Sequence, residues 1–262
     1  MASLTDTNDM LILWGEVDPD ATDESALNDW WTNEHLPERL RLPGFVRARR
    51  YCSLGSHGKR EYLAWYEVTD VQDLASEDYL YALNHPTPKT QQFMPCLSTM
   101  NRSACRTDRC PHANLEWDNC QNFEHQYLIV LVMNPETPHD YQQAIPTLLE
   151  QYIQKSILAS TERVRVHIAI EDSAITTAGT ASKSYDDVLF KPQRSGGKII
   201  ALVEVQLQSS PRAIFDWKWA QNIVSTIEAT GLHVEHSNNY ELLCSMDRSD
   251  VVVEADASSA TG

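Results

Sequence analysis

The sequence predicts an α+β fold made of two consecutive βαββαβ halves, whose sheets pack together into one barrel within a single polypeptide. Two observations predict it. The same order of apolar strands and amphipathic helices runs twice along the 262 residues. In addition, a four-stranded sheet with helices on one face leaves its other face apolar, and that face must be covered. Two tandem units can cover each other; the alternative is two independent ferredoxin-like domains that each pair with a partner chain.

The first half, residues 9–105, opens on a short apolar run at 10–17, MLILWGEV, which predicts a strand. Thr22 and Asp23 are candidate caps for a helix that Pro37 interrupts or restarts and Pro43-Gly44 ends. The elements expected next are strands over 45–53 and 61–68, a helix over about 71–83, a break at His85-Pro86, a helical remainder to about 94, and a strand over 98–105.

The second half, residues 125–247, repeats this order with little residue identity, so the repeat is one of architecture. Its expected elements are strands over 126–133, 163–170, 198–207 and 233–246, and helices over 140–158 and 213–229. Residues 106–124 are expected to be a linker, about 173–197 a long loop, and 1–8 and 248–262 disordered tails.

Charge and composition exclude several classes of function. The net charge is −16, from 37 acidic and 21 basic side chains. Such a polyanion repels phosphate backbones and anionic membrane surfaces, so neither nucleic acid nor membrane is expected as a partner. The N-terminal MASLTDTNDM lacks the basic start and apolar run of a signal peptide, and the expected location is cytoplasmic.

The cysteines offer one metal hypothesis. Cys105, Cys110, His112 and Cys120 lie close together in a polar stretch, which could indicate zinc. The paired Cys-x-x-Cys of structural zinc sites is absent, however, so reduced thiols in a linker are favoured and no metal is expected. No glycine-rich nucleotide loop and no nucleophile-elbow motif occurs either.

The densest cluster of functional side-chain types lies between Trp30 and Tyr51. Trp31 and His35 are four residues apart and share a helix face, which Glu38 or Arg39 joins if the helix continues past Pro37. On the following strand, alternation places a second set of side chains on one side: Phe45, Arg47, Arg49 and Tyr51. Two arginines on a face that meets other structure need an anionic partner, either Glu34 or Glu38 or a substrate carboxylate.

These residues also carry a resemblance to a known family. The run W-W-x-N-E-H-L-P-x-R-L, followed by P-G-F and R-R-Y, resembles the EthD-like branch of the dimeric α+β barrel superfamily, here in a fused, tandem form. The strand YLAWYEVTD and the later NHPTP are similar to the same group. The resemblance covers about residues 10–95. Because the second half has no W-x-x-E-H counterpart, it implies one site, in the first half.

The resemblance implies a small-molecule enzyme without a cofactor, acting on an aromatic or polyketide-type compound, as in fungal secondary metabolism. The wider superfamily also holds cyclases, isomerases, quinone-forming monooxygenases and haem enzymes, so the pocket is implied more firmly than the reaction. The leading expectation is a lyase, namely an aromatic-acid decarboxylase. The alternatives are a polyketide-type cyclase or isomerase, and a non-catalytic small-ligand or stress-associated protein.

Decarboxylation of an aromatic acid needs a cation for the carboxylate, an acid for the ring carbon and an apolar pocket. Arg47 or Arg49 would supply the cation, and His35 the acid, with Glu34 and His85 as further candidate catalytic residues. The expected pocket side chains are Trp14, Trp30, Trp31, Tyr51, Trp65 and Tyr66.

Each assignment has a structural alternative. His35 can pair within its helix, the arginines can form structural salt bridges, and the tryptophans can be core. The expected assembly is a monomeric barrel or a homodimer of fused barrels.

Overall fold

The computed structural model describes residues 8–18, 20–54, 60–108, 125–134, 145, 163–190, 197–207 and 218–251. The chain divides into two packing units, each interrupted in sequence. The first unit comprises Asn8–Arg106, Asp172–Pro192 and Leu243–Gly262; the second comprises Met1–Thr7, Thr107–Glu171 and Gln193–Leu242. Segments that follow the first half in sequence therefore pack with it. The expected division into halves at residues 9–105 and 125–247 stays a prediction.

Four antiparallel strands form the sheet of the first unit: β1 (Asp9–Val17), β2 (Phe45–Ser53), β3 (Arg60–Val68) and β4 (Leu97–Asp108). Their order across the sheet is β4-β1-β3-β2, with Leu11 of β1 opposite Tyr66 of β3. This is the order of a split βαβ unit, and all four predicted strands of the first half are confirmed.

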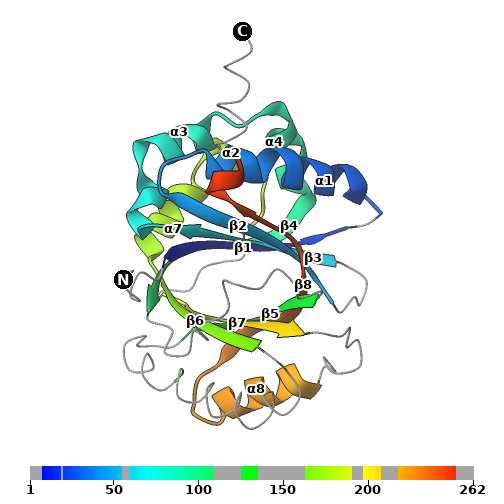
Figure 1. Cartoon of the computed structure of the whole chain (residues 1–262), viewed down its shortest axis with the longest axis vertical. Helices are drawn as coiled ribbons and strands as arrows, with labels where there is room; N and C mark the ends of the chain where they lie inside the picture. Colours follow the sequence, from blue (N-terminus) through cyan, green and yellow to red (C-terminus); the bar gives the residue numbers. More distant parts are fainter. Residues whose placement is uncertain are drawn as a thin grey trace. The chain divides into compact units, whose positions relative to one another are not determined.

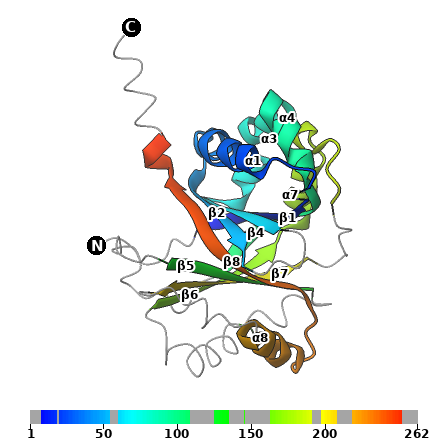
Figure 2. The same ribbon diagram turned by 90° about the vertical axis from the view of Figure 1, so that its right-hand side faces the viewer.

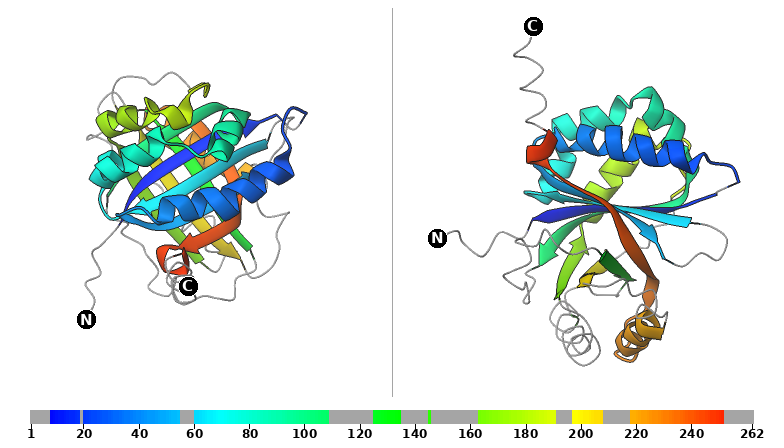
Figure 3. Two further views of the ribbon diagram at one scale, coloured as in Figure 1. Left: turned by 90° about the horizontal axis from the view of Figure 1, so that it is seen from above. Right: turned by 45° about the vertical axis from the view of Figure 1, so that its right-hand side comes forward.

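Helical segments cover one face of this sheet, which is called the helix face below (Figure 1, Figure 3). They are α1 (Glu24–Trp30), η1 (Trp31–His35), α2 (Leu36–Leu40), η2 (Val71–Ala75), α3 (Glu77–Asn84), α4 (Pro88–Phe93) and η3 (Met94–Cys96). Asp23 begins α1 by accepting the backbone N–H of Ala26 at 3.0 Å. The expected single helix over 71–83 is wrong, because the 3₁₀ turn η2 ends at an extended Ser76, which caps α3.

The first helix passes through Pro37 by way of a π-helical turn. In η1 the backbone N–H of Leu36 bonds the carbonyl of Trp31, five residues back, and α2 then begins with Pro37 in its first turn. Proline has no N–H to donate, so a widened turn next to it costs little hydrogen bonding. The expectation that Pro37 interrupts or restarts the helix is wrong, because the helical backbone continues from η1 into α2, and side chains on both sides of Pro37 stay on one helix face.

A β-bulge in β2 changes which of its side chains share a face. The register shifts between Phe45 and Arg47. Phe45 and Ala48 therefore both pack into the core on the helix face, three residues apart. The expectation that Phe45 shares a side with Arg47, Arg49 and Tyr51 is wrong, because the extra residue of a bulge reverses the alternation. Arg50 is the β2 arginine on the helix face.

The expected long loop over 173–197 is also wrong in its first part. Residues there form α7 (Ser173–Thr180) and the 3₁₀ turn η5 (Lys183–Tyr185). Asp172 caps α7, and the Thr176 side chain accepts the backbone N–H of Ala104 at 2.9 Å. Ser184 donates to the carbonyl of Leu83 at 2.7 Å. This segment is thus built into the first unit, and it brings Tyr185 into that unit's core.

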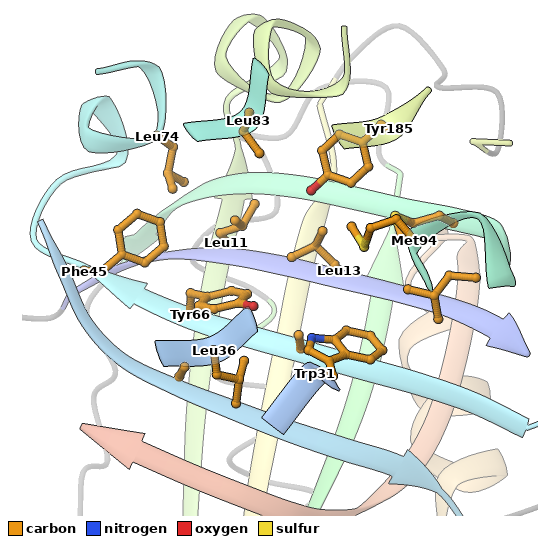
Figure 4. Close-up of a cluster of buried hydrophobic side chains, with 14 of the residues drawn as sticks. Leu11, Leu13, Trp31, Leu36, Phe45, Tyr66, Leu74, Leu83, Met94 and Tyr185 are labelled. Atoms are coloured by element: carbon orange, nitrogen blue, oxygen red, sulfur yellow. The ribbon is translucent and has the colours of Figure 1, made fainter. Parts of the chain in front are cut away.

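The apolar core of the first unit lies between the sheet and the helical segments (Figure 4). Alternate residues of the strands point into it, such as Leu11 and Leu13 of β1, and they meet Leu36, Leu74 and Leu83 from the helical layer. Residues 248–251, expected to be part of a disordered tail, also belong here. Arg248 donates to the carbonyls of Leu40, Leu42 and Phe45, which fastens the end of α2; residues 252–262 lie outside the described residues.

The second unit has its own sheet of β5 (His125–Met133), β6 (Arg163–Glu171), β7 (Ile199–Leu207) and β8 (Val234–Asp247, of which Val234–Leu242 belong to this unit). Its antiparallel order is β6-β7-β5-β8. The helix α8 (Lys218–Glu228) lies on one face of this sheet (Figure 2). Its Ile223 and Ile227 side chains belong to the apolar core of this unit. All predicted strands are confirmed, but the helix predicted over 140–158 falls outside the described residues except for Ile145.

The α+β class is confirmed. The complete second βαββαβ unit and the packing of both sheets into one barrel stay predictions. Among the described residues, no helix is long and apolar enough to cross a membrane.

Gly44 allows a direct test of the turn that ends the first helix. It has φ +82°, and a Cβ there would overlap the carboxyl group of Asp73, which caps η2. We expect Gly44→Ala to lower the free energy of unfolding by about 1 kcal/mol for the left-handed backbone and by about 2 kcal/mol more for the overlap.

The matched control is Gly231→Ala, measured by urea denaturation alongside it. Gly231 has φ +90° but open space around its Cβ position, so only the backbone part should be lost. Equal losses in the two variants would contradict the role given to Asp73.

Candidate functional site

A small cavity lies on the helix face of the first unit. Its lining combines an apolar wall with a cluster of polar side chains: Leu11, Leu13, Trp31, His35, Arg39, Ala64, Tyr66, Tyr79, Met94, Met100 and Tyr185. Figure 4 shows Trp31, Tyr66, Met94 and Tyr185 around the same space, with the Tyr66 and Tyr185 hydroxyl groups directed inward from opposite sides. About 10 Å³ is open to the centre of a water molecule, which is room for one water.

Helix geometry brings three of the polar groups together. Trp31, His35 and Arg39 are spaced by four residues and line the same cavity, because the helix continues through the π turn and Pro37. π-helical turns are frequent at functional sites. The four-residue spacing predicts that Trp31 and His35 share a helix face, and that Glu38 or Arg39 joins them if the helix continues past Pro37. In the structure Trp31, His35 and Arg39 all line the cavity.

His35 is a buried, neutral imidazole. Only 6% of the residue is exposed, and its ring lies 4.9 Å from that of Trp30. Burial lowers the pKa of His35 well below its ordinary value, and the positive charges of Arg39 and Arg50 lower the pKa further. Its Nδ1 has no hydrogen-bond partner; the nearest carboxylate oxygen, on Glu38, is 3.9 Å away. At neutral pH this side chain accepts a proton and has none to give.

Arg39 is a buried cation whose terminal nitrogens are unsatisfied. The residue is 3% exposed, and neither Nη1 nor Nη2 makes a hydrogen bond. The Glu38 carboxylate is 3.8 Å from Nη2, beyond hydrogen-bond distance. A buried donor without a hydrogen bond costs free energy. This wall of the cavity is therefore suited to a negatively charged or anion-forming group.

Two tyrosines complete the polar lining and keep their protons. Burial raises the pKa of Tyr66 far above its usual range and raises the pKa of Tyr185 to about 12. Arg102, fully buried, donates to the hydroxyl of Tyr79 at 3.2 Å and to the carbonyl of Thr176 at 3.0 Å. Gly179 leaves room for that guanidinium, since a Cβ would overlap it. Tyr66 and Tyr185 can therefore act as hydrogen-bond donors or acids at neutral pH.

Two predicted catalytic residues lie away from the cavity. Glu34 is partly exposed and pairs with Lys89 at 2.9 Å and with the hydroxyl of Thr87 at 3.3 Å. His85 is exposed, stacks on Tyr81 with ring centroids 3.9 Å apart, and bonds the carbonyl of Tyr81. Glu34 and His35 are adjacent on a helix and therefore point to different sides, as the spacing alone indicates.

The predicted substrate-binding residues divide between the two faces of the sheet. Arg49 lies on the face away from the helices, paired with Glu67 at 2.7 Å and stacked on Trp65 at 4.5 Å. Arg47 pairs with Asp247. The strand register puts Trp14 on that same face, and Tyr51 follows from the alternation after the bulge. Of the predicted set, Trp31 and Tyr66 reach the cavity. The two predicted arginines make structural salt bridges.

Sequence reasoning missed Arg50 and Tyr185. Arg50 was hidden by the bulge, which reverses the alternation on which the assignment rested. Tyr185 lies 80 residues beyond the end of the first half at residue 105, in a segment without a clear helical pattern, so no local signal places it there. No group of three or more His, Cys, Asp or Glu side chains that could hold a metal occurs among the described residues. Cys105 is buried and is not in a disulfide, and Cys110, His112 and Cys120 fall outside the described part of the chain.

Comparison with known proteins supports the fold. No family model and no curated protein matches the sequence. A solved structure of an anthrone oxidase-like protein has a TM-score of 0.53 at 14% identity, over 93% of this chain and 94% of that one. A candidate monooxygenase from Fusobacterium nucleatum subsp. nucleatum has a TM-score of 0.47 at 7% identity, over 92% of this chain and 95% of that one.

A chlorite dismutase-like structure has a TM-score of 0.43 at 13% identity, over 94% of this chain and 98% of that one. At such identities, structural similarity is evidence for the fold alone. Only the anthrone oxidase-like structure, of the three described, has a TM-score high enough to support it. The chain thus shares the fold of that anthrone oxidase-like protein, and its place in the dimeric α+β barrel superfamily stays a prediction. Its membership of the EthD-like branch stays a prediction.

Proposed function

We propose that the chain is a small-molecule enzyme that removes a proton from a hydroxylated aromatic or polyketide-type compound and stabilises the resulting anion. One observation carries the proposal: the neutral imidazole of His35 and the unsatisfied guanidinium of Arg39 line the same cavity. A base with a lowered pKa next to a free buried cation is the arrangement that forms and holds a phenolate or enolate.

The remaining walls suit an aromatic ring. Leu11, Leu13 and Ala64 provide an apolar floor, and Trp31 provides an aromatic side. The space now open is too small for a ring, so binding requires side chains to move. Met94 and Met100 line the cavity, and their flexible side chains allow it to enlarge by changing rotamers.

Decarboxylation, the leading expectation from the sequence, is the second candidate. The terminal donors of Arg39 also fit a carboxylate. A neutral His35 cannot deliver the proton that the ring carbon needs, so in this reaction Tyr66 or Tyr185 would be the acid. The absence of a cofactor stays a prediction for both reactions.

The test uses the full chain with two probes, anthrone and 2,4-dihydroxybenzoate. The structural neighbour that supports the fold is described as anthrone oxidase-like, which makes anthrone the first choice. We expect exchange of the anthrone methylene protons in D2O under nitrogen, followed by NMR, to be faster with the protein than with buffer. Carbon dioxide release from the acid would instead support the lyase.

Oxygen uptake measured with anthrone in air separates two fates of the anion. Uptake indicates oxidation of the methylene to a carbonyl, with one O₂ consumed and one water formed. Exchange without uptake indicates proton transfer alone, as in an isomerase or cyclase. Saturable binding of either probe without exchange or carbon dioxide would contradict catalysis and indicate a non-catalytic binding protein.

A further inference from the structure

A second, open pocket lies beside the first cavity in the same unit, and Trp31 stands between them. It has a volume of about 250 Å³ and is lined by Asn28, Thr32, Arg50, Cys52, Arg60, Tyr62 and Leu243. The ring of Trp31 lies 4.6 Å from the guanidinium carbon of Arg50 and lines the inner cavity as well. This space is called the Arg50 pocket below. Pockets for drug-sized ligands begin at about 300 Å³, so a slightly smaller pocket suits a ligand with a single ring.

Arg50 is a buried cation with neutral partners. The residue is 1% exposed. Its Nη1 donates to the carbonyl of Asn28 at 3.2 Å and to the hydroxyl of Thr32 at 2.5 Å, and its Nη2 donates to Oδ1 of Asn28 at 2.6 Å. No carboxylate among the described residues pairs with it. The neighbouring carboxylate of Glu24 is taken by the Tyr62 hydroxyl at 2.5 Å and by Arg60 at 3.4 Å.

These bonds leave one edge of the guanidinium unused. The Nε–H has no partner, and one of the two N–H groups on Nη2 remains. Side by side, these two donors form the fork that a carboxylate accepts in two parallel hydrogen bonds. Stacking on Trp31 and Tyr62 holds the plane of the guanidinium in place.

We propose that the Arg50 pocket is a binding subsite for the carboxylate group of an aromatic acid. Arg50 receives the carboxylate, and Tyr62 and Leu243 flank the ring. Burial lowers the pKa of Arg50 to about 10, so the cation is still present at neutral pH. This subsite does not depend on the chemistry proposed for the inner cavity.

The test is calorimetric titration of the full chain with benzoate and with benzamide, its neutral counterpart. We expect saturable binding of benzoate and much weaker binding of benzamide. Arg50→Gln should weaken benzoate binding about tenfold to a hundredfold, because a charge-assisted hydrogen-bonded pair is lost. Arg39→Gln should leave this binding in place, which separates the Arg50 pocket from the inner cavity.

A second variant keeps the test decisive if Arg50→Gln fails to fold. Leu243 lines the pocket and is partly exposed, so Leu243→Trp should fill the pocket and block benzoate while every hydrogen bond of Arg50 stays in place. The matched control is Leu189→Trp, at an exposed leucine outside the pocket, which should bind benzoate like the parent chain. The subsite is refuted if the parent chain does not bind benzoate, if Leu243→Trp binds it normally, or if Arg39→Gln alone abolishes binding.

Discussion

Replacing His35 with glutamine is expected to slow anthrone proton exchange about 10²- to 10⁴-fold, the usual contribution of a positioned general base. Glutamine keeps a polar group of similar size in the cavity but cannot take up the proton. The exposed His85 receives the same substitution as a matched control, and His85→Gln should exchange protons at the parent rate. Equal rates for the parent chain and His35→Gln would remove His35 from the mechanism.

The pH dependence gives an independent readout of the same residue. The neutral form of His35 is the active base, and its pKa is lowered well below 6.5 by burial and by Arg39 and Arg50. The exchange rate should therefore stay level as the pH falls to 6.5 and decline only below that. A midpoint at or above 6.5 would contradict the neutral, buried imidazole.

The free energy of unfolding should also depend on the protonation of His35. The unfolded chain protonates this histidine near pH 6.5, whereas the folded chain does so at lower pH. Below pH 6.5 the unfolded state therefore binds more protons, and the free energy of unfolding decreases as the pH falls towards the folded pKa. His35→Gln should lack this component of the slope in urea denaturation measured between pH 7 and pH 5.

Arg39→Met is expected to raise the free energy of unfolding by about 1–4 kcal/mol, the range seen when a buried ionic group is replaced by an apolar one of similar volume. Methionine fills the space of the arginine stem and removes a guanidinium whose two terminal nitrogens have no hydrogen bond. The same change should abolish exchange catalysis, because nothing then stabilises the anion. A gain in stability together with a loss of activity is characteristic of a functional site.

Two further variants test whether the charge and its shape both matter. Arg39→Lys keeps the charge without the planar fork, so partial activity is expected. Arg106→Met is the matched control, since Arg106 is about half exposed and pairs with Asp172 at 3.4 Å; it should change stability by less than about 1 kcal/mol. Loss of stability in Arg39→Met would mean that Arg39 has a structural role.

The sequence by itself determined the strands and the main helix of the candidate site. Strands were readable because alternation and apolar runs are local, as in MLILWGEV, and each matched the structure within three residues at either end. The helix that begins at Asp23 was readable from its cap and from four-residue spacing, which placed Trp31 and His35 on one side; that Arg39 rather than Glu38 joins them in the cavity became clear only from the structure. These signals depend on neighbours along the chain and need no tertiary information.

Tertiary structure decided which face each strand residue occupies and which distant segment completes the site. The bulge after Phe45 reverses the alternation of β2, so Arg50 reaches the helix face while Arg47 and Arg49 enter salt bridges on the other. Alternation breaks wherever one residue is inserted, and only the pairing with the neighbouring strand reveals the insertion.

The contribution of 172–192 is a matter of long-range packing. Ser184 bonds Leu83, 101 residues away in sequence, and Tyr185 then lines a cavity otherwise built from the first 100 residues. A fragment ending at 108 would therefore lack part of the cavity wall. The feature that gives the site its chemistry is a buried guanidinium whose terminal nitrogens make no hydrogen bond, in the same cavity as a neutral imidazole, and it also depends on burial. Burial results from the whole packed unit, so it cannot be read from the order of residues.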